Sequence, residues 1–65
     1  MKVVLNGDAR EIVAANLDQA LGELGYTDSS VATAVNGTFI PKAHRRNQLL
    51  DDGDRIEIVA PMQGG

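Results

Sequence analysis

The residues best suited to chemistry are at the C-terminal end of the chain, Pro61-Met62-Gln63-Gly64-Gly65. Without a Cβ, Gly64 and Gly65 can adopt backbone angles closed to other residues and let another backbone approach closely. Such a thin, flexible peptide could enter a narrow channel of a partner enzyme, although a merely frayed terminus is the alternative. An ATP-using partner could adenylate the terminal carboxylate, and a sulfur or amine nucleophile could then take the carbonyl. We therefore expect Gly65 to be the reactive position and residues 61–64 to be presented to the partner.

Composition excludes most other chemistry. The chain has 65 residues, no cysteine, and a single histidine, His44. It therefore has no disulfide, no thiolate metal site and no thiol nucleophile, and a self-contained catalytic triad is not expected. The formal net charge of -3 argues against a nucleic-acid partner, which usually requires a basic footprint. Neither a membrane span nor a signal peptide is visible, so we expect a cytoplasmic protein without a membrane partner. We also expect it to be a monomer when free.

Two polar clusters are candidate sites. Asp51, Asp52 and Asp54 resemble the start of a cation loop but lack the remaining ligand positions, so a solvated turn is preferred and no metal site is expected. The run at 44–46, His-Arg-Arg, could contact a phosphate or an acidic partner, but a solvated surface link is the preferred interpretation.

Three apolar residues are candidates for a partner surface. Val4 and Val59 alternate away from the expected buried faces and, on adjacent central strands, would form an exposed patch. Scattered surface valines are the alternative. Phe39 is either a core residue or part of the same docking patch.

The elements that must position these residues follow from local patterns. Asn6-Gly7 and Asn36-Gly37 each separate two short apolar runs, which predicts hairpins with type I′ turns. Val3, Leu5 and Ile12 should share the buried face of the first hairpin. The expected strands are 2–5, 9–13, 31–35, 38–40 and 55–60, with a short helical or irregular link at 42–50 anchored by Leu49 and Leu50.

One helix is predicted after the first hairpin. Leu17, Ala20, Leu21 and Leu24 follow helical spacing, with Asn16 as N-cap, Gln19 completing a capping-box-like pair, and Gly25 as the stop signal. The order of hairpin, helix and further strands predicts an α+β fold in which the last strand lies beside the first. We expect a ubiquitin-like β-grasp, a mixed sheet of about four to five strands on one main helix. The domain is expected at 1–60 and the flexible tail at 61–65.

Three stretches of the chain resemble the ThiS family of sulfur carrier proteins in thiamine biosynthesis, within the MoaD/ThiS superfamily. They are Ala34–Lys42 (AVNGTFIPK), Leu50–Val59 (LDDGDRIEIV) and the terminal Gly64-Gly65. The opening Val3–Gly7 and the total length fit the same family, so the resemblance covers essentially the whole chain. One departure is Val13–Asn16, which lacks the Gly- and Thr-rich turn of many members.

The resemblance implies the β-grasp fold and a defined route for sulfur. A ThiF-type enzyme would adenylate Gly65 with ATP and magnesium, while the carrier itself binds no cofactor. Sulfur from a cysteine desulfurase persulfide would convert the acyl-adenylate to a thiocarboxylate, in some members through an acyl-disulfide to a partner cysteine. The thiocarboxylate would then donate its sulfur to thiazole synthase (ThiG).

Other functions are also compatible with these residues. A MoaD-like subunit of molybdopterin synthase would use the same chemistry, but such chains are usually longer. A ubiquitin-like modifier would form isopeptide conjugates, and a plain interaction module would tolerate loss of the two terminal glycines. An enzyme in its own right is the least favoured class, because no nucleophile and general-base pair can be assembled from these residues.

Overall fold

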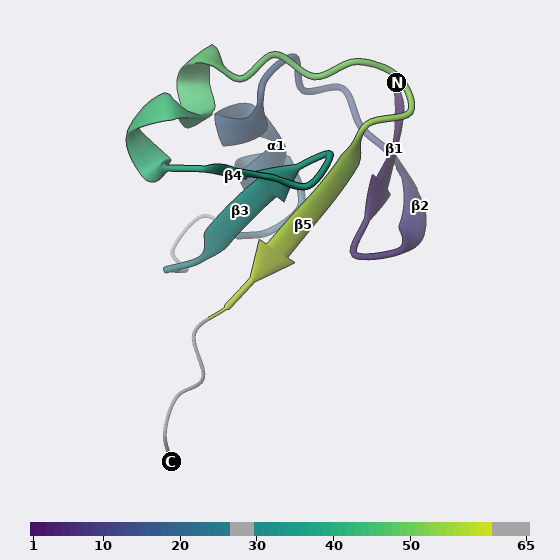
Figure 1. The fold of residues 1–65 in the computed structure, drawn as a ribbon. Coiled ribbons are helices and arrows are strands. Elements are labelled where there is room, and N and C mark those ends of the chain that lie inside the picture. Colours follow the sequence, from purple (N-terminus) through teal and green to yellow (C-terminus); the bar gives the residue numbers. More distant parts are fainter. Residues whose placement is uncertain (27–29, 61–65) are drawn as a thin grey trace.

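The computed structural model describes residues 1–26 and 30–60. Within these ranges the chain forms a single five-stranded sheet in the order β2-β1-β5-β3-β4 (Figure 1). The elements are β1 (Lys2–Leu5), β2 (Asp8–Glu11), α1 (Leu17–Glu23), β3 (Ala32–Val35), β4 (Thr38–Ile40), the 3-10 helix η1 (Lys42–Asn47) and β5 (Arg55–Val59). No helix in these ranges is long and apolar enough to cross a membrane.

Both Asn-Gly dipeptides form the predicted hairpin turns. Asn6 and Gly7 have φ of 47° and 89°, and Asn36 and Gly37 have φ of 51° and 84°. A type I′ turn needs positive φ at both central residues, which glycine and asparagine tolerate best. The turns set the antiparallel pairing of β1 with β2 and of β3 with β4.

The last strand lies in the middle of the sheet, as predicted. β5 runs parallel to β1, with Leu5 opposite Ile56, and antiparallel to β3, with Val35 opposite the same Ile56. A parallel pair requires a long crossover, and here the crossover contains α1, the β3–β4 hairpin and η1. The mixed sheet with one main helix is the β-grasp arrangement.

The helix boundaries agree with the capping residues. Asn16 has extended backbone angles, and its side chain accepts a 2.8 Å hydrogen bond from the Gln19 backbone N–H. The Gln19 side-chain oxygen accepts a hydrogen bond from the N–H of Ala15, one residue before the N-cap. In a capping box this oxygen would accept from the N–H of the N-cap residue itself, so the pair differs from that motif by one position. Gly25 follows the helix with φ of 94°, which confirms it as the stop residue.

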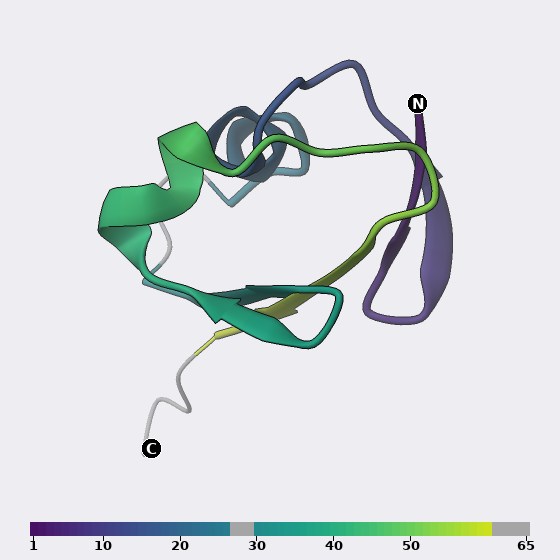
Figure 2. The same cartoon turned by 45° about the horizontal axis from the view of Figure 1, so that its top comes forward.

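Helix α1 covers one face of the sheet, and the opposite face has no helix over it in the described ranges (Figure 2). The core fills the space between α1 and the sheet, with side chains from every strand except β2. The expected inward residues Val3, Leu5 and Ile12 are all buried. The full set of buried apolar residues is Val3, Leu5, Ile12, Ala14, Leu17, Ala20, Leu21, Val35, Ile40, Leu50, Ile56 and Ile58.

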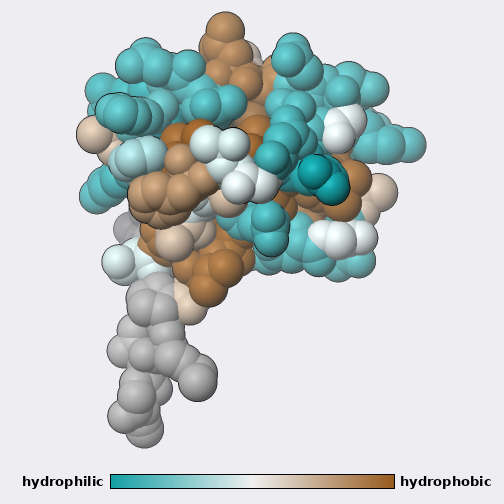
Figure 3. Space-filling model, in the orientation of Figure 1, coloured by the Kyte–Doolittle hydropathy of each residue, from teal (hydrophilic) through white to brown (hydrophobic). Residues whose placement is uncertain are grey.

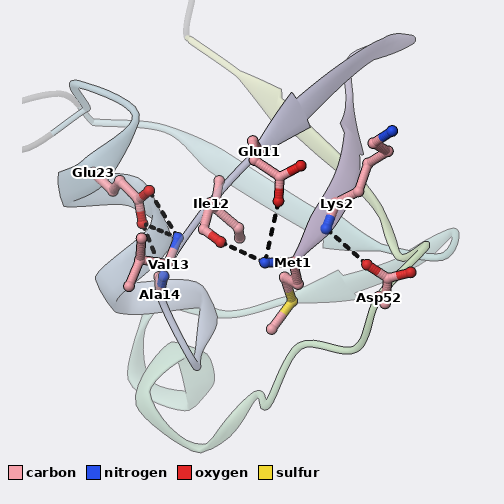
Figure 4. A network of polar contacts seen from close by, with 8 residues as sticks. All are labelled: Met1, Lys2, Glu11, Ile12, Val13, Ala14, Glu23 and Asp52. Atoms are coloured by element: carbon pink, nitrogen blue, oxygen red, sulfur yellow. Dashed lines mark hydrogen bonds and ion pairs between the residues drawn. The ribbon is translucent and has the colours of Figure 1, made fainter.

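The second strand is shorter than predicted. β2 ends at Glu11, and the Val13 side chain is 92% exposed. The cause is Glu23 at the end of α1, whose carboxylate accepts hydrogen bonds of 2.8–3.0 Å from the backbone N–H groups of Val13 and Ala14 (Figure 4). These N–H groups are therefore satisfied by the helix rather than by a strand.

The acidic turn before β5 also has a structural role. The Asp52 side chain accepts the Lys2 backbone N–H at 2.8 Å (Figure 4), and the Asp54 side chain accepts the N–H of Asp51. Two of the three carboxylates thus hold the chain in position rather than only facing water. In the preceding link, Leu50 is buried as expected, but Leu49 is 70% exposed, so only one leucine anchors the link.

Candidate partner-docking site

The predicted reactive tail lies outside the described residues. The described residues end at Ala60, directly after β5. The reactive role of Gly65 and the presentation of Pro61, Met62, Gln63 and Gly64 to a partner therefore stay predictions. The geometry nevertheless limits where a partner can act. Because a chain extends at most about 3.6 Å per residue, Gly65 can reach no further than roughly 18 Å from Ala60. An enzyme that reacts with Gly65 must therefore approach the end of β5.

The uncovered face of the sheet is apolar near that point. Phe39 on β4 and Val59 on β5 are 64% and 63% exposed. Phe39 lies opposite Ala34 of β3, and Val59 lies opposite Ala32, so all four side chains are on the same face of adjacent strands. Figure 3 shows hydrophobic atoms gathered on this side of the molecule, above the point where β5 ends. We call these four residues the apolar patch.

Phe39 is thus excluded as a core residue. Ile40, its neighbour in β4, faces the core instead and is buried. The exposed phenylalanine and valine, with two alanines between them, form a compact apolar surface, which is a candidate for partner contact. The alternation of β4 decides which of the two neighbouring residues is exposed, because successive side chains of a strand point to opposite faces.

Val4 does not join this patch, which corrects the prediction of a joint Val4–Val59 surface. In the parallel pairing Val4 lies opposite Arg55, four residues before Val59 along β5. At about 3.3 Å per residue this offset separates the two valines by roughly 13 Å. The charged side chains of Arg55 and Glu57 lie on the same exposed face between them. Val4 itself is half-buried.

Two asparagines that sequence reasoning assigned only to turns also position β5. The Asn6 side chain accepts the N–H of Ile58 at 2.9 Å and donates to its carbonyl at 3.1 Å. The Asn36 side chain accepts the N–H of Arg55 at 2.9 Å and donates to the Asp54 carboxylate at 3.0 Å. The strand that leads to the tail is therefore fixed from both sides by turn residues.

The solvated interpretation of residues 44–46 is wrong for Arg45. His44 and Arg46 are exposed, but Arg45 is only 7% exposed. Its guanidinium donates to the Thr33 hydroxyl at 3.1 Å and to the Val31 carbonyl at 2.6 Å, which fastens η1 to the start of β3. The one sequence signal was Thr33 itself, a polar side chain at an inward position of a strand, where a hydrogen-bond partner is required.

The described residues provide a surface suited to docking. Within 1–26 and 30–60 there is no group of three or more His, Asp or Glu side chains arranged to hold a metal ion. What the arrangement provides is a rigid strand that ends beside the apolar patch and leads toward Gly65.

Comparison with known proteins identifies the family of this chain. A model of the ThiS family matches residues 3–65. The sulfur carrier protein ThiS of Thermus thermophilus is 36% identical over 63 residues, which cover 97% of this chain and 98% of that protein. A thiazole synthase of Paramagnetospirillum magneticum is 39% identical over 66 residues, covering all of this chain but only 20% of that protein.

The solved structures agree with the sequence comparison. The crystal structure of the thiamine biosynthesis protein ThiS from Geobacter metallireducens has a TM-score of 0.83, with 25% identity and full coverage of both chains. The solution structure of a thiamine biosynthesis protein from the same organism has a TM-score of 0.80 and covers 88% of that chain. The chain therefore belongs to the ThiS family of β-grasp sulfur carrier proteins of thiamine biosynthesis.

Proposed function

We propose that the sulfur is carried on the C-terminal carboxyl group of Gly65. The observation that carries this proposal is the placement of β5, which ends next to the apolar patch and continues into the segment Pro61–Gly65. An enzyme seated on the patch would be within the roughly 18 Å that this segment can span. The carrier would then act as a co-substrate, with the catalytic groups on its partners.

The proposed chemistry has two steps. A ThiF-type enzyme with bound ATP and magnesium lets a Gly65 carboxylate oxygen attack the α-phosphorus, and pyrophosphate leaves. A sulfur nucleophile then attacks the carbonyl carbon, and AMP leaves with that oxygen. Sulfide gives the thiocarboxylate directly. A persulfide from a cysteine desulfurase first gives an acyl-disulfide, and a thiol must supply two electrons to cleave its S–S bond.

Thiazole synthase is the proposed acceptor of the sulfur. The support is the Paramagnetospirillum thiazole synthase, which matches this whole chain over a fifth of its own length. A carrier joined to its acceptor enzyme would have a high effective concentration near it. In this chain, the apolar patch would supply a contact with the enzyme.

The decisive experiment is an intact-mass measurement. The chain is incubated with ATP, magnesium, a ThiF-type enzyme and sulfide, and the expected product has one oxygen replaced by sulfur. A chain lacking Gly65 and a reaction without ATP are the controls and should show no gain. If the full chain stays unmodified while the Thermus ThiS is converted under the same conditions, the proposal is wrong.

The patch can be tested with matched variants. Val59→Ser and Phe39→Ser should each raise the Kd for thiazole synthase about fivefold or more, because each removes an exposed apolar contact. Val13→Ser is the control, since Val13 is also an exposed valine but lies away from β5. Equal Kd values for Val59→Ser and Val13→Ser would remove the patch from the proposal.

A further inference from the structure

The central strand β5 is paired unequally on its two sides. On the β3 side the pairing extends to the last residue of the strand, with Ala32 opposite Val59. On the β1 side the paired residues stop at Leu5 opposite Ile56. Beyond this point β1 turns into the first hairpin, and Figures 1 and 2 show the β1–β2 hairpin diverging from the C-terminal end of β5.

On this side of β5, hydrogen bonding continues beyond the paired residues through a side chain. The backbone N–H of Asn6 donates to the Ile56 carbonyl at 2.9 Å, as in a parallel ladder. The next two backbone groups, the N–H and carbonyl of Ile58, are both taken by the Asn6 carboxamide. The side chain thus replaces a strand residue that the hairpin does not supply.

The ladder then ends with an available backbone group. Alternate residues of a strand direct their N–H and carbonyl to the same neighbour. Since residues 54, 56 and 58 bond toward β1, the next residue in that series is Ala60. Its N–H donates to no atom of residues 1–26 or 30–60, and Ala60 is exposed. An unpaired edge of this kind is a template for an added strand.

We propose that an extended segment of thiazole synthase adds to this edge as a strand and accepts a hydrogen bond from the N–H of Ala60. This proposal rests on the proposed function, in which thiazole synthase receives the sulfur from Gly65. Its support is reach, because the chain from Ala60 to Gly65 spans at most about 18 Å, so the enzyme must bind within that distance of Ala60.

The outer edge of β2, at the other end of the sheet, does not meet this condition. The outer edge of β2 includes Ala9, which lies opposite Val4. Val4 uses its N–H for Asp54, so the N–H of Ala9 points away from β1 and toward the outside of the sheet. It also donates to no atom of the described residues. This edge lies beyond β1 as seen from β5, away from the strand that continues to the tail.

The pair Ala60 and Ala9 permits a matched test. At 65 residues the chain is accessible to total chemical synthesis, so the N–H of either alanine can be replaced by an ester oxygen while the methyl side chain stays. Binding to thiazole synthase is measured by titration calorimetry. The Ala60 ester should raise Kd about three- to tenfold, the loss of one intermolecular hydrogen bond. The Ala9 ester should leave Kd unchanged, and both should unfold in urea like the all-amide chain.

The outcomes separate this proposal from the proposed function. If the all-amide chain neither binds thiazole synthase nor becomes thiocarboxylated, the proposed function fails. If it does both and the Ala60 ester binds equally well, only the added strand is refuted. An effect of the Ala60 ester on the adenylating enzyme alone would show that a different enzyme occupies the edge, and would also refute the assignment to thiazole synthase.

A second measurement needs no chemical substitution. Amide hydrogen exchange of Ala60 should slow in the complex with thiazole synthase, because the N–H becomes bonded. Exchange at Ala9 should stay as fast as in the free chain. Equal protection of both amides would indicate general burial and not strand addition, and would contradict the proposal.

Discussion

The two Asn-Gly turns share their sequence and backbone geometry but differ in what their side chains hold. Asn6 pairs both backbone groups of Ile58, 52 residues away, in a partly buried setting. Asn36 bonds the exposed N–H of Arg55 and the carboxylate of Asp54. Local chemistry is therefore sufficient to form each turn, whereas the neighbouring strand decides how much the asparagine side chain contributes to stability.

The largest expected effect is the removal of the Asn6 side chain. Asn6→Gly retains tolerance for positive φ but leaves the N–H and carbonyl of Ile58 without their partner. Loss of two hydrogen bonds at a partly buried site should lower the free energy of unfolding by about 2–3 kcal/mol. Urea unfolding followed by circular dichroism measures it. A loss below that of Asn36→Gly would contradict the contrast between the turns.

Asn36→Gly is the matched second change. Its two hydrogen bonds are exposed, so water can replace them, and the expected loss is about 1 kcal/mol. The same urea titration gives the comparison directly. Because both variants place glycine at a position with positive φ, their difference reports the side-chain contacts and not the turn conformation.

The glycines of the turns should respond alike. Gly7→Ala and Gly37→Ala both place a Cβ at positive φ, and at both positions the added Cβ would meet no atom within 4 Å. Each change should therefore cost about 1 kcal/mol of backbone strain and no more. Thermal unfolding can compare the two. A clear difference between them would show that the turns are not equivalent even in their backbones.

The smallest expected effect is a coupling energy. Asn36 and Asp54 share a 3.0 Å hydrogen bond on the surface. A double-mutant cycle with Asn36→Gly and Asp54→Ala should give an interaction of about 0.5 kcal/mol. Asn6→Gly combined with Asp54→Ala serves as the control pair and should be additive within error. A nonzero interaction energy in the control pair would mean that the two turns are energetically coupled through β5.

Much of the fold followed from patterns that act over a few residues. The two turns, the helix start at Asn16, the stop at Gly25 and the inward side of β5 all depend on backbone preferences or on the alternation of neighbouring side chains. The shortening of β2 did not, because it depends on Glu23, which lies ten residues beyond Val13 in sequence and meets it only in the folded chain.

The candidate site also has features that follow from local sequence and features that depend on the folded chain. The terminal Gly64-Gly65 and the docking candidate Phe39 can be read directly from the residues. The folded chain is needed to show that Phe39 is exposed on the same face as Val59, across β3, that Val4 lies apart from Val59, and that Arg45 is buried. The cause of this difference is strand register. A strand's own alternation is encoded locally, but which of its residues stands beside a strand 50 residues away depends on packing of the whole core. The same register leaves Ala60 at an open edge, next to the tail that would carry the sulfur.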